Sequence, residues 1–117
     1  MRKKLLRSLT KRRDFELVFK EGDSLSSEHL VMYARLNELN YNRLGLSVGK
    51  KIGNAVTRNR IKRLLKEAMR RVLGEFPLNY DFVIIATRSS LEGKLDDFIQ
   101  DIRKFIIRIT EAHAVPS

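Results

Sequence analysis

Cysteine and tryptophan are absent from this 117-residue sequence, which has only two prolines and two histidines. Without cysteine the chain can form neither a disulfide scaffold nor a zinc–thiolate site, and it has no thiol nucleophile. Apolar runs are short, as in Phe82 to Ala86, whereas a membrane-spanning helix needs roughly 20 residues. The basic N-terminal segment also lacks the apolar stretch of a secretory signal peptide. These absences lead us to expect a cytoplasmic protein.

Acidic residues are scarce relative to basic ones: 24 Lys and Arg stand against 14 Asp and Glu, for a formal charge of +10. The excess lies in residues 1–13, which have seven basic and no acidic residues, and in residues 50–71, which have nine basic residues and Glu67. The rest of the chain carries a net charge of −5. Clustering of one sign favours a polyanionic partner, most commonly nucleic acid. An anionic membrane is the alternative, and it requires an amphipathic helix with exposed apolar residues.

Hydrophobic periodicity predicts one α+β domain, a sandwich of one sheet and helices spanning residues 1–117. An apolar content of 43% is sufficient for a core at this length. We expect flexible ends at residues 1–9 and 112–117. The predicted elements are a helix over residues 11–21 capped by Thr10, strands over residues 24–27, 29–36 and 44–49, a helix from an N-cap at Asn54 to before Gly74, a strand over residues 81–87, and a final helix that begins with a capping box at Ser89 and Glu92.

One face of the strand over residues 44–49 carries only Gly45, Ser47 and Gly49. Such a bare face permits close approach of a ligand or makes room for a neighbouring helix, and the sequence leaves both open. This strand, the basic helix after it and the strand over residues 81–87 are predicted to form a βαβ crossover. The general rule favours the right-handed form of that unit.

Few residues in this sequence could form a catalytic centre on the protein itself. We interpret His29 and His113 as exposed or packed histidines, because neither has a metal-ligating companion at a characteristic spacing. Asp97 and Asp101 lie one helical turn apart, a spacing that permits magnesium binding but more often marks a solvated helix face. The glycine spacings match neither of the common phosphate-binding loops. The sequence therefore favours a binding surface over a catalytic centre.

The helix that follows Asn54 has an apolar stripe that we expect to face the core, which leaves its basic stripe free for phosphate contacts. Because the apolar side of this helix would face the core, it could not insert into a membrane surface, and the membrane alternative is disfavoured. The aromatic residues Phe15, Phe19 and Tyr33 can stack on unpaired bases. For Phe15 and Phe19, helical spacing alone favours core packing over a ligand.

A third group of basic residues lies at the predicted start of the first helix. Lys11, Arg12 and Arg13 stand at the positive end of that helix dipole, an arrangement that is locally unfavourable. A bound phosphate would reverse the sign of this effect. We therefore predict additional phosphate contacts from these three residues.

A specific motif marks the second basic segment: Ile52, Ala55, Arg58-Asn59-Arg60-Ile61-Lys62-Arg63, Leu65 and Lys66. Supporting runs are Asp14-Phe15, Val18-Phe19 and Gly22, and Leu44-Gly45-Leu46-Ser47-Val48 before Lys50-Lys51-Ile52-Gly53-Asn54. With these residues the sequence resembles the bacterial ribonuclease P protein subunit over most of residues 10–108.

The resemblance implies a small protein cofactor of a catalytic RNA. Together, the protein and the RNA would remove the 5′ leader of precursor tRNA by metal-assisted hydrolysis. The catalytic centre would lie in the RNA, magnesium would be held mainly by the RNA, and the protein alone would be inactive. Contacts to the catalytic RNA would come from Arg58, Asn59, Arg60, Lys62, Arg63 and Lys66. Contacts to the single-stranded leader would come from Phe15, Phe19, Tyr33, Lys50 and Lys51.

The resemblance also changes two interpretations made from pattern alone. Phe15 and Phe19 would line a leader cleft between the first helix and the sheet, and the βαβ crossover would take the rare left-handed form. Gly49 departs from the family pattern, in which many members carry serine, so a hydroxyl contact to the substrate is not expected there. No obligate protein partner is evident.

Two alternatives share some of these features. A ribosomal or ribosome-assembly RNA-binding protein would have the same size, charge and basic helix but would need no aromatic leader cleft. A protein-only nuclease would cleave without an RNA cofactor and would depend on Asp97 or Asp101.

Overall fold

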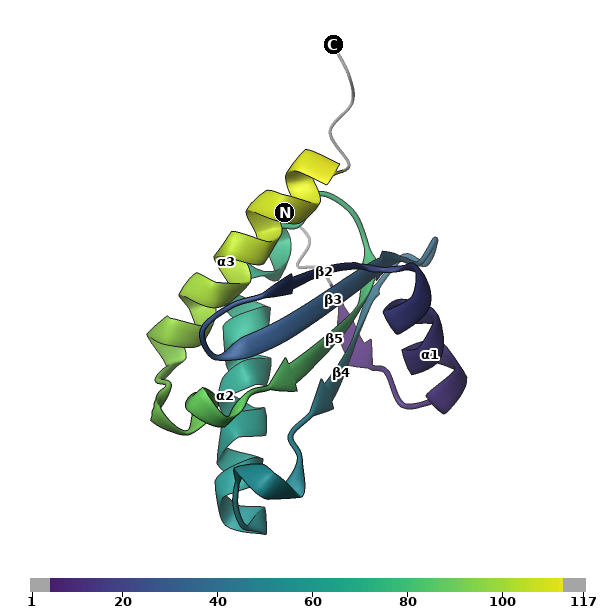
Figure 1. Cartoon of the computed structure of the whole chain (residues 1–117). Coiled ribbons are helices and arrows are strands. Elements are labelled where there is room, and N and C mark those ends of the chain that lie inside the picture. Colours follow the sequence, from purple (N-terminus) through teal and green to yellow (C-terminus); the bar gives the residue numbers. More distant parts are fainter. Residues whose placement is uncertain (1–4, 113–117) are drawn as a thin grey trace.

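A five-stranded mixed sheet separates two layers of helices (Figure 1). The computed structural model describes residues 5–112. Helices α2 and α3 cover one face of the sheet, and α1 lies on the other. The strands are β1 (Leu6–Ser8), β2 (Asp23–Ser26), β3 (Leu30–Leu36), β4 (Asn42–Ser47) and β5 (Tyr80–Ala86). The helices are α1 (Arg12–Glu21), α2 (Ala55–Val72) and α3 (Leu95–Ala112), with short 3-10 segments η1 (Lys50–Ile52), η2 (Leu73–Glu75) and η3 (Arg88–Glu92).

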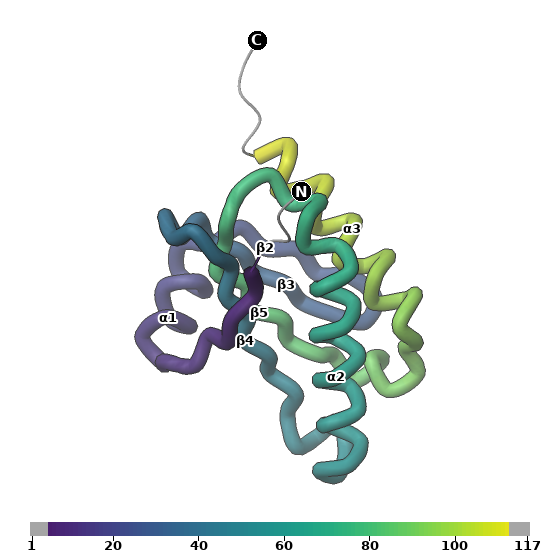
Figure 2. The backbone as a smooth tube through the Cα atoms, turned by 180° about the vertical axis from the view of Figure 1, so that it is seen from behind, coloured from purple at the N-terminus to yellow at the C-terminus, as the bar shows by residue number. Residues whose placement is uncertain are grey.

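The strand order is β1-β4-β5-β3-β2, with parallel pairing of β1 with β4 and of β4 with β5. Strand β3 is antiparallel to both of its neighbours. The connection from β4 through α2 to β5 is the expected βαβ crossover, and Figures 1 and 2 show that it is left-handed. The general preference for the right-handed form therefore predicts this connection wrongly, and the resemblance predicts it correctly.

The core has two parts, one on each face of the sheet. The larger part joins the sheet to α2 and α3 through residues such as Phe82, Leu65 and Phe105. The smaller part lies under α1 and contains Leu9, Val18 and Val83. Because β5 is covered on both faces, its residues Phe82 to Ala86 form a continuous apolar run rather than an alternating one.

The predicted N-cap is confirmed for α2 but not for α1. The Asn54 side chain accepts a hydrogen bond from the Thr57 N–H at 2.9 Å, which confirms the predicted N-cap of α2. The prediction that Thr10 caps α1 is wrong, because Lys11 takes the N-cap position without a side-chain cap.

The predicted capping box of the last helix is also wrong. Ser89 and Glu92 lie in η3, and the Ser89 hydroxyl donates to the Glu28 carbonyl instead of capping a helix. The start of α3 is stabilised by Asp97, whose carboxylate accepts a hydrogen bond from the Lys94 N–H at 2.8 Å. The helix therefore begins at Leu95, six residues after the serine that we expected to cap it.

The prediction of a flexible tail through residue 9 fails for the part of the tail that the structure describes. The carbonyl of Leu5 accepts a hydrogen bond from the Asn42 N–H, and the Leu9 N–H donates to the Leu44 carbonyl. These bonds hold β1 against β4, and Leu9 is only 3% exposed because it packs under α1. Residues 1–4 and 113–117, including His113, lie outside the described part of the chain.

Among the described residues, no helix is both long enough and apolar enough to cross a membrane.

Candidate nucleic-acid interface

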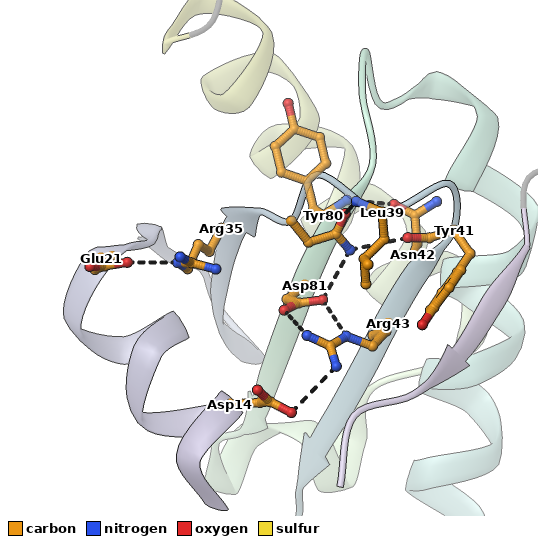
Figure 3. Close-up of polar contacts among 10 residues, drawn as sticks. Asp14, Glu21, Arg35, Leu39, Tyr41, Asn42, Arg43, Tyr80 and Asp81 are labelled. Carbon is orange, nitrogen blue, oxygen red and sulfur yellow. Dashed lines mark hydrogen bonds and ion pairs between the residues drawn. The ribbon is translucent and has the colours of Figure 1, made fainter. Parts of the chain in front are cut away.

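An ionic cluster fixes α1 against the sheet (Figure 3). Arg43 on β4 donates two hydrogen bonds to Asp81 on β5, at 2.7 and 2.6 Å, and a third to Asp14 on α1 at 3.3 Å. The hydrogen bond to Asp81 raises the pKa of the Arg43 guanidinium, against the opposing effect of burial. Asn37 donates a further hydrogen bond to Asp81 at 3.0 Å. The sequence offered no signal for this cluster, because its members are 29 and 38 residues apart.

The three predicted aromatic residues form one cluster between α1 and β3. The Phe19 ring meets the Tyr33 ring edge-on with centroids 4.9 Å apart, and it lies 6.4 Å from the Phe15 ring. Phe19 is 42% exposed, whereas Phe15 and Tyr33 are half-buried. The cluster therefore combines an exposed ring with two rings that hold it in place.

The bare face of β4 makes room for this cluster. A Cβ atom placed on Gly45 would lie only 2.3 Å from Cζ of Phe15, so the ring occupies the space that any larger residue would fill. Gly49, in contrast, has nothing within 4 Å of such an atom. At Gly45, then, the glycine accommodates the neighbouring helix, which was one of the two explanations that the sequence left open.

We predict that Gly45→Ala displaces the Phe15 ring and lowers the free energy of unfolding by about 1 to 3 kcal/mol, the usual cost of overpacking. Urea denaturation would measure this loss. Gly49→Ala is the matched control, since its φ of −70° suits any residue and its surroundings are open. Equal stability of the two variants would contradict the tight contact at Gly45.

The predicted basic stripe lies on the outer side of α2. Asn59, Arg60, Arg63 and Lys66 are exposed, and Arg58 and Lys62 are half-buried. Within the described part of the chain, none of the five basic residues in this set forms an ion pair. The Nε atom of Arg58 is buried and has no hydrogen-bond partner. The stripe thus presents uncompensated positive charge, the property that favours contact with phosphates.

The other predicted basic residues lie on η1 and at the start of α1. Lys50 and Lys51 are exposed on η1, between the end of β4 and the start of α2. At the start of α1, Lys11, Arg12 and Arg13 are all exposed, and Arg12 also pairs with Glu16 at 3.2 Å. The pair with Glu16 offsets part of the unfavourable helix-dipole interaction that the sequence indicated.

The interpretation of Asp97 and Asp101 as one solvated pair is wrong. Asp101 is 3% exposed, and its carboxylate lies 2.9 Å from Nδ1 of His29, whose ring packs edge-on against Phe98. Asp97 lies in the first turn of α3 and accepts the hydrogen bond from the Lys94 N–H. Among residues 5–112, no group of three His, Asp or Glu side chains is arranged to hold a metal ion. Asp97 and Asp101 therefore have structural roles.

Comparison with known proteins places this chain in a family. The family model described as ribonuclease P matches residues 3–110. The chain belongs to the ribonuclease P protein family. The ribonuclease P protein component of Clostridioides difficile (strain 630) is 41% identical over 103 residues, which cover 87% of this chain and 90% of that protein.

Two solved ribonuclease P proteins have the same fold. The protein from Thermotoga maritima aligns with a TM-score of 0.77 at 36% identity, covering 88% of this chain and 97% of that one. The protein from Staphylococcus aureus aligns with a TM-score of 0.75 at 30% identity, covering 89% and 94%. The α+β architecture described above is therefore the fold of ribonuclease P proteins.

Proposed function

We propose that this chain is the protein cofactor of ribonuclease P, which binds the catalytic RNA and the single-stranded 5′ leader of precursor tRNA. The observation that carries this proposal is the separation of two surfaces by one sheet. The uncompensated basic stripe of α2 lies on one side, and the exposed aromatic cluster of α1 and β3 lies on the other. A protein with two such faces can contact a structured RNA and an unpaired strand at once.

The stripe on α2 is proposed as the contact with the catalytic RNA, through Arg58, Asn59, Arg60, Lys62, Arg63 and Lys66. Arginine gives forked hydrogen bonds to phosphate oxygens, and lysine contributes a point charge. These contacts fix register and orientation without reading sequence. Asn59 can also hydrogen-bond to a base edge or a sugar hydroxyl.

The leader is proposed to lie along the sheet face beside α1. Phe19 offers an exposed ring for base stacking, while Phe15 and Tyr33 hold it in place. Alternation along β3 puts Val31 on the same face as Tyr33, so the half-buried Val31 extends the apolar floor toward the end of the sheet. Lys50 and Lys51 would then contact leader phosphates, with Lys11, Arg12 and Arg13 as further phosphate contacts.

In this proposal the hydrolytic centre and most of the magnesium belong to the RNA, and the protein raises affinity for substrate and metal by neutralising phosphates. Precursor tRNA is the substrate and the cytoplasm the place of action. The proposal assigns no obligate protein partner. A ribosomal or ribosome-assembly protein remains the alternative function, and it would not need the exposed ring of Phe19.

The decisive experiment is cleavage of precursor tRNA by the matching catalytic RNA at low magnesium, with and without this protein, alongside the protein alone. Stimulation that requires the RNA is expected, with no cleavage by the protein alone. Absence of stimulation would favour the ribosomal alternative. Cleavage by the protein alone would favour a protein-only nuclease.

We predict that Phe19→Ala weakens binding of precursor tRNA to the holoenzyme by roughly fivefold or more, because one stacked base contributes about 1 to 3 kcal/mol. Mature tRNA, which lacks the leader, should bind as before. Titration of labelled precursor and mature tRNA would measure both. Phe19→Tyr is the control, since it keeps the ring, and equal losses for the two tRNAs would assign Phe19 to packing alone.

A further inference from the structure

A small recess lies between the first strand and the C-terminal half of α2, away from the motif residues Arg58 to Arg63. It has a volume of about 80 Å³. Its lining consists of Leu6, Arg7, Ser8, Leu44, Lys66 and Arg70. No acidic residue is among them, and the two leucines lie beside the basic side chains of Lys66 and Arg70. Arg7 is opposite Arg43 in the register and its guanidinium lies 4.6 Å from the centroid of the Tyr41 ring, so its charge is on the other side of the sheet. The recess is thus a small, electropositive site at the sheet edge.

The two α2 residues of the recess carry uncompensated charge. Lys66 and Arg70 lie one helical turn apart, and both are exposed. In the described part of the chain neither forms an ion pair, because the nearby Glu67 is bound by Arg71 at 2.9 Å. Lys62 precedes them by one further turn, so the recess continues the basic stripe of α2 toward β1.

Strand β1 supplies a hydroxyl to the same site. In the parallel register Ser8 lies opposite Leu44, which belongs to the core between the sheet and α2. The Ser8 side chain is therefore on the α2 side of the sheet, where the recess lies. Its backbone is also available, because the bonds from Leu5 and Leu9 to β4 leave the alternate residues of β1 facing the free edge.

We propose that this recess binds one backbone phosphate of the catalytic RNA, held by Lys66 and Arg70 from α2 and by Ser8 from β1. The inference rests on the proposed function and extends it. The RNA contact then runs beyond the Arg58 to Lys66 motif to the sheet edge, and it involves the N-terminal strand. Bound RNA bridges β1 and α2, so it stabilises the short pairing of β1 with β4.

The first test replaces Arg70 by glutamine and measures affinity for the catalytic RNA at several salt concentrations. Removal of one charged group from the site should weaken binding roughly five- to twentyfold and reduce the salt slope by about one. Arg108→Gln is the matched control: it makes the same charge change at an exposed residue of α3 that is in no ion pair among residues 5–112. Equal effects of the two variants would overturn the phosphate site.

A second variant, Ser8→Asp, tests the contribution of β1. A carboxylate in the recess should repel the phosphate and weaken RNA binding at least as much as Arg70→Gln does. Ser26→Asp is its control, because Ser26 is exposed on β2 at the opposite edge of the sheet. Circular dichroism would show that both variants are folded. Equal RNA affinity of Ser8→Asp and Ser26→Asp would exclude β1 from the contact.

Hydrogen exchange tests the proposed contact of β1 with the RNA in the unaltered protein. Addition of the catalytic RNA should slow exchange at the Leu9 N–H, which closes the pairing of β1 with β4. Unchanged exchange at this amide in the saturated complex would overturn the bridging role. If the unaltered protein did not bind the RNA at all, the proposed function would fail. Normal binding by the unaltered protein with equal behaviour of Arg70→Gln and Arg108→Gln would instead overturn only the phosphate site.

Discussion

Replacing Arg43 by methionine should lower the free energy of unfolding by about 3 kcal/mol. The reason is the carboxylate that the substitution leaves behind. Asp81 is 2% exposed and receives two hydrogen bonds from the Arg43 guanidinium. Without Arg43 its remaining side-chain donor is Asn37, at 3.0 Å. A buried charge without its partner costs far more than the ion pair itself contributes to stability.

Urea denaturation of three variants would test this explanation. Arg35→Met is the matched control, because its ion pair with Glu21 is 33% and 48% exposed and should contribute less than about 1 kcal/mol. The double variant Arg43→Met with Asp81→Asn should recover part of the lost stability, since it removes the stranded charge. A loss in Arg43→Met no larger than that in Arg35→Met would show that Asp81 does not depend on Arg43.

Arg43→Met should affect the proposed leader-binding surface more than the proposed surface for the catalytic RNA. Arg43 also holds Asp14 at 3.3 Å, and this contact ties α1 to the sheet. At a temperature where the variant remains folded, α1 and its phenylalanines should be less firmly placed, while α2 on the other face keeps its packing. We therefore expect weaker discrimination between precursor and mature tRNA with little change in affinity for the catalytic RNA.

Local patterns were sufficient to predict most of the elements. Helix α2 has a strong apolar period and an asparagine cap, and both are properties of neighbouring residues. The almost fully buried strand β5 was recognisable from the uninterrupted apolar run Phe82 to Ala86. The outward position of the basic stripe followed from the same helical period, because an apolar stripe that packs inward leaves the opposite side exposed.

The features that local sequence patterns did not predict depend on contacts between residues that are far apart in sequence. Strand β1 is ordered only because β4, more than 30 residues later, supplies its hydrogen bonds. Asp101 is buried in contact with His29, which lies 72 residues before it in the sequence. Neither contact produces a periodic sequence pattern, so β1 resembled part of a tail and Asp101 resembled a residue of a solvated helix face. The left-handed crossover is likewise a property of the packed layers, and it was predicted only through family resemblance.

The second large effect concerns the basic stripe. Changing Arg60 and Arg63 together to glutamine should weaken binding to the catalytic RNA by about a hundredfold, since each charge-assisted contact contributes roughly a factor of ten. The salt slope should fall by about two, one for each phosphate that the variant no longer neutralises. Both residues are exposed, and neither is in an ion pair among residues 5–112, so the fold should be unaffected.

The control must separate contact from net charge, because removing any two positive charges weakens attraction to RNA. Lys104 and Arg108 are exposed on α3, so the double change to glutamine there alters the net charge equally at another surface. Filter binding at several salt concentrations would compare the two variants. A reduced slope for the α2 variant alone would place phosphates at Arg60 and Arg63. Equal slopes would mean that the stripe acts through the overall field, and the catalytic RNA would then have to contact another face of the protein.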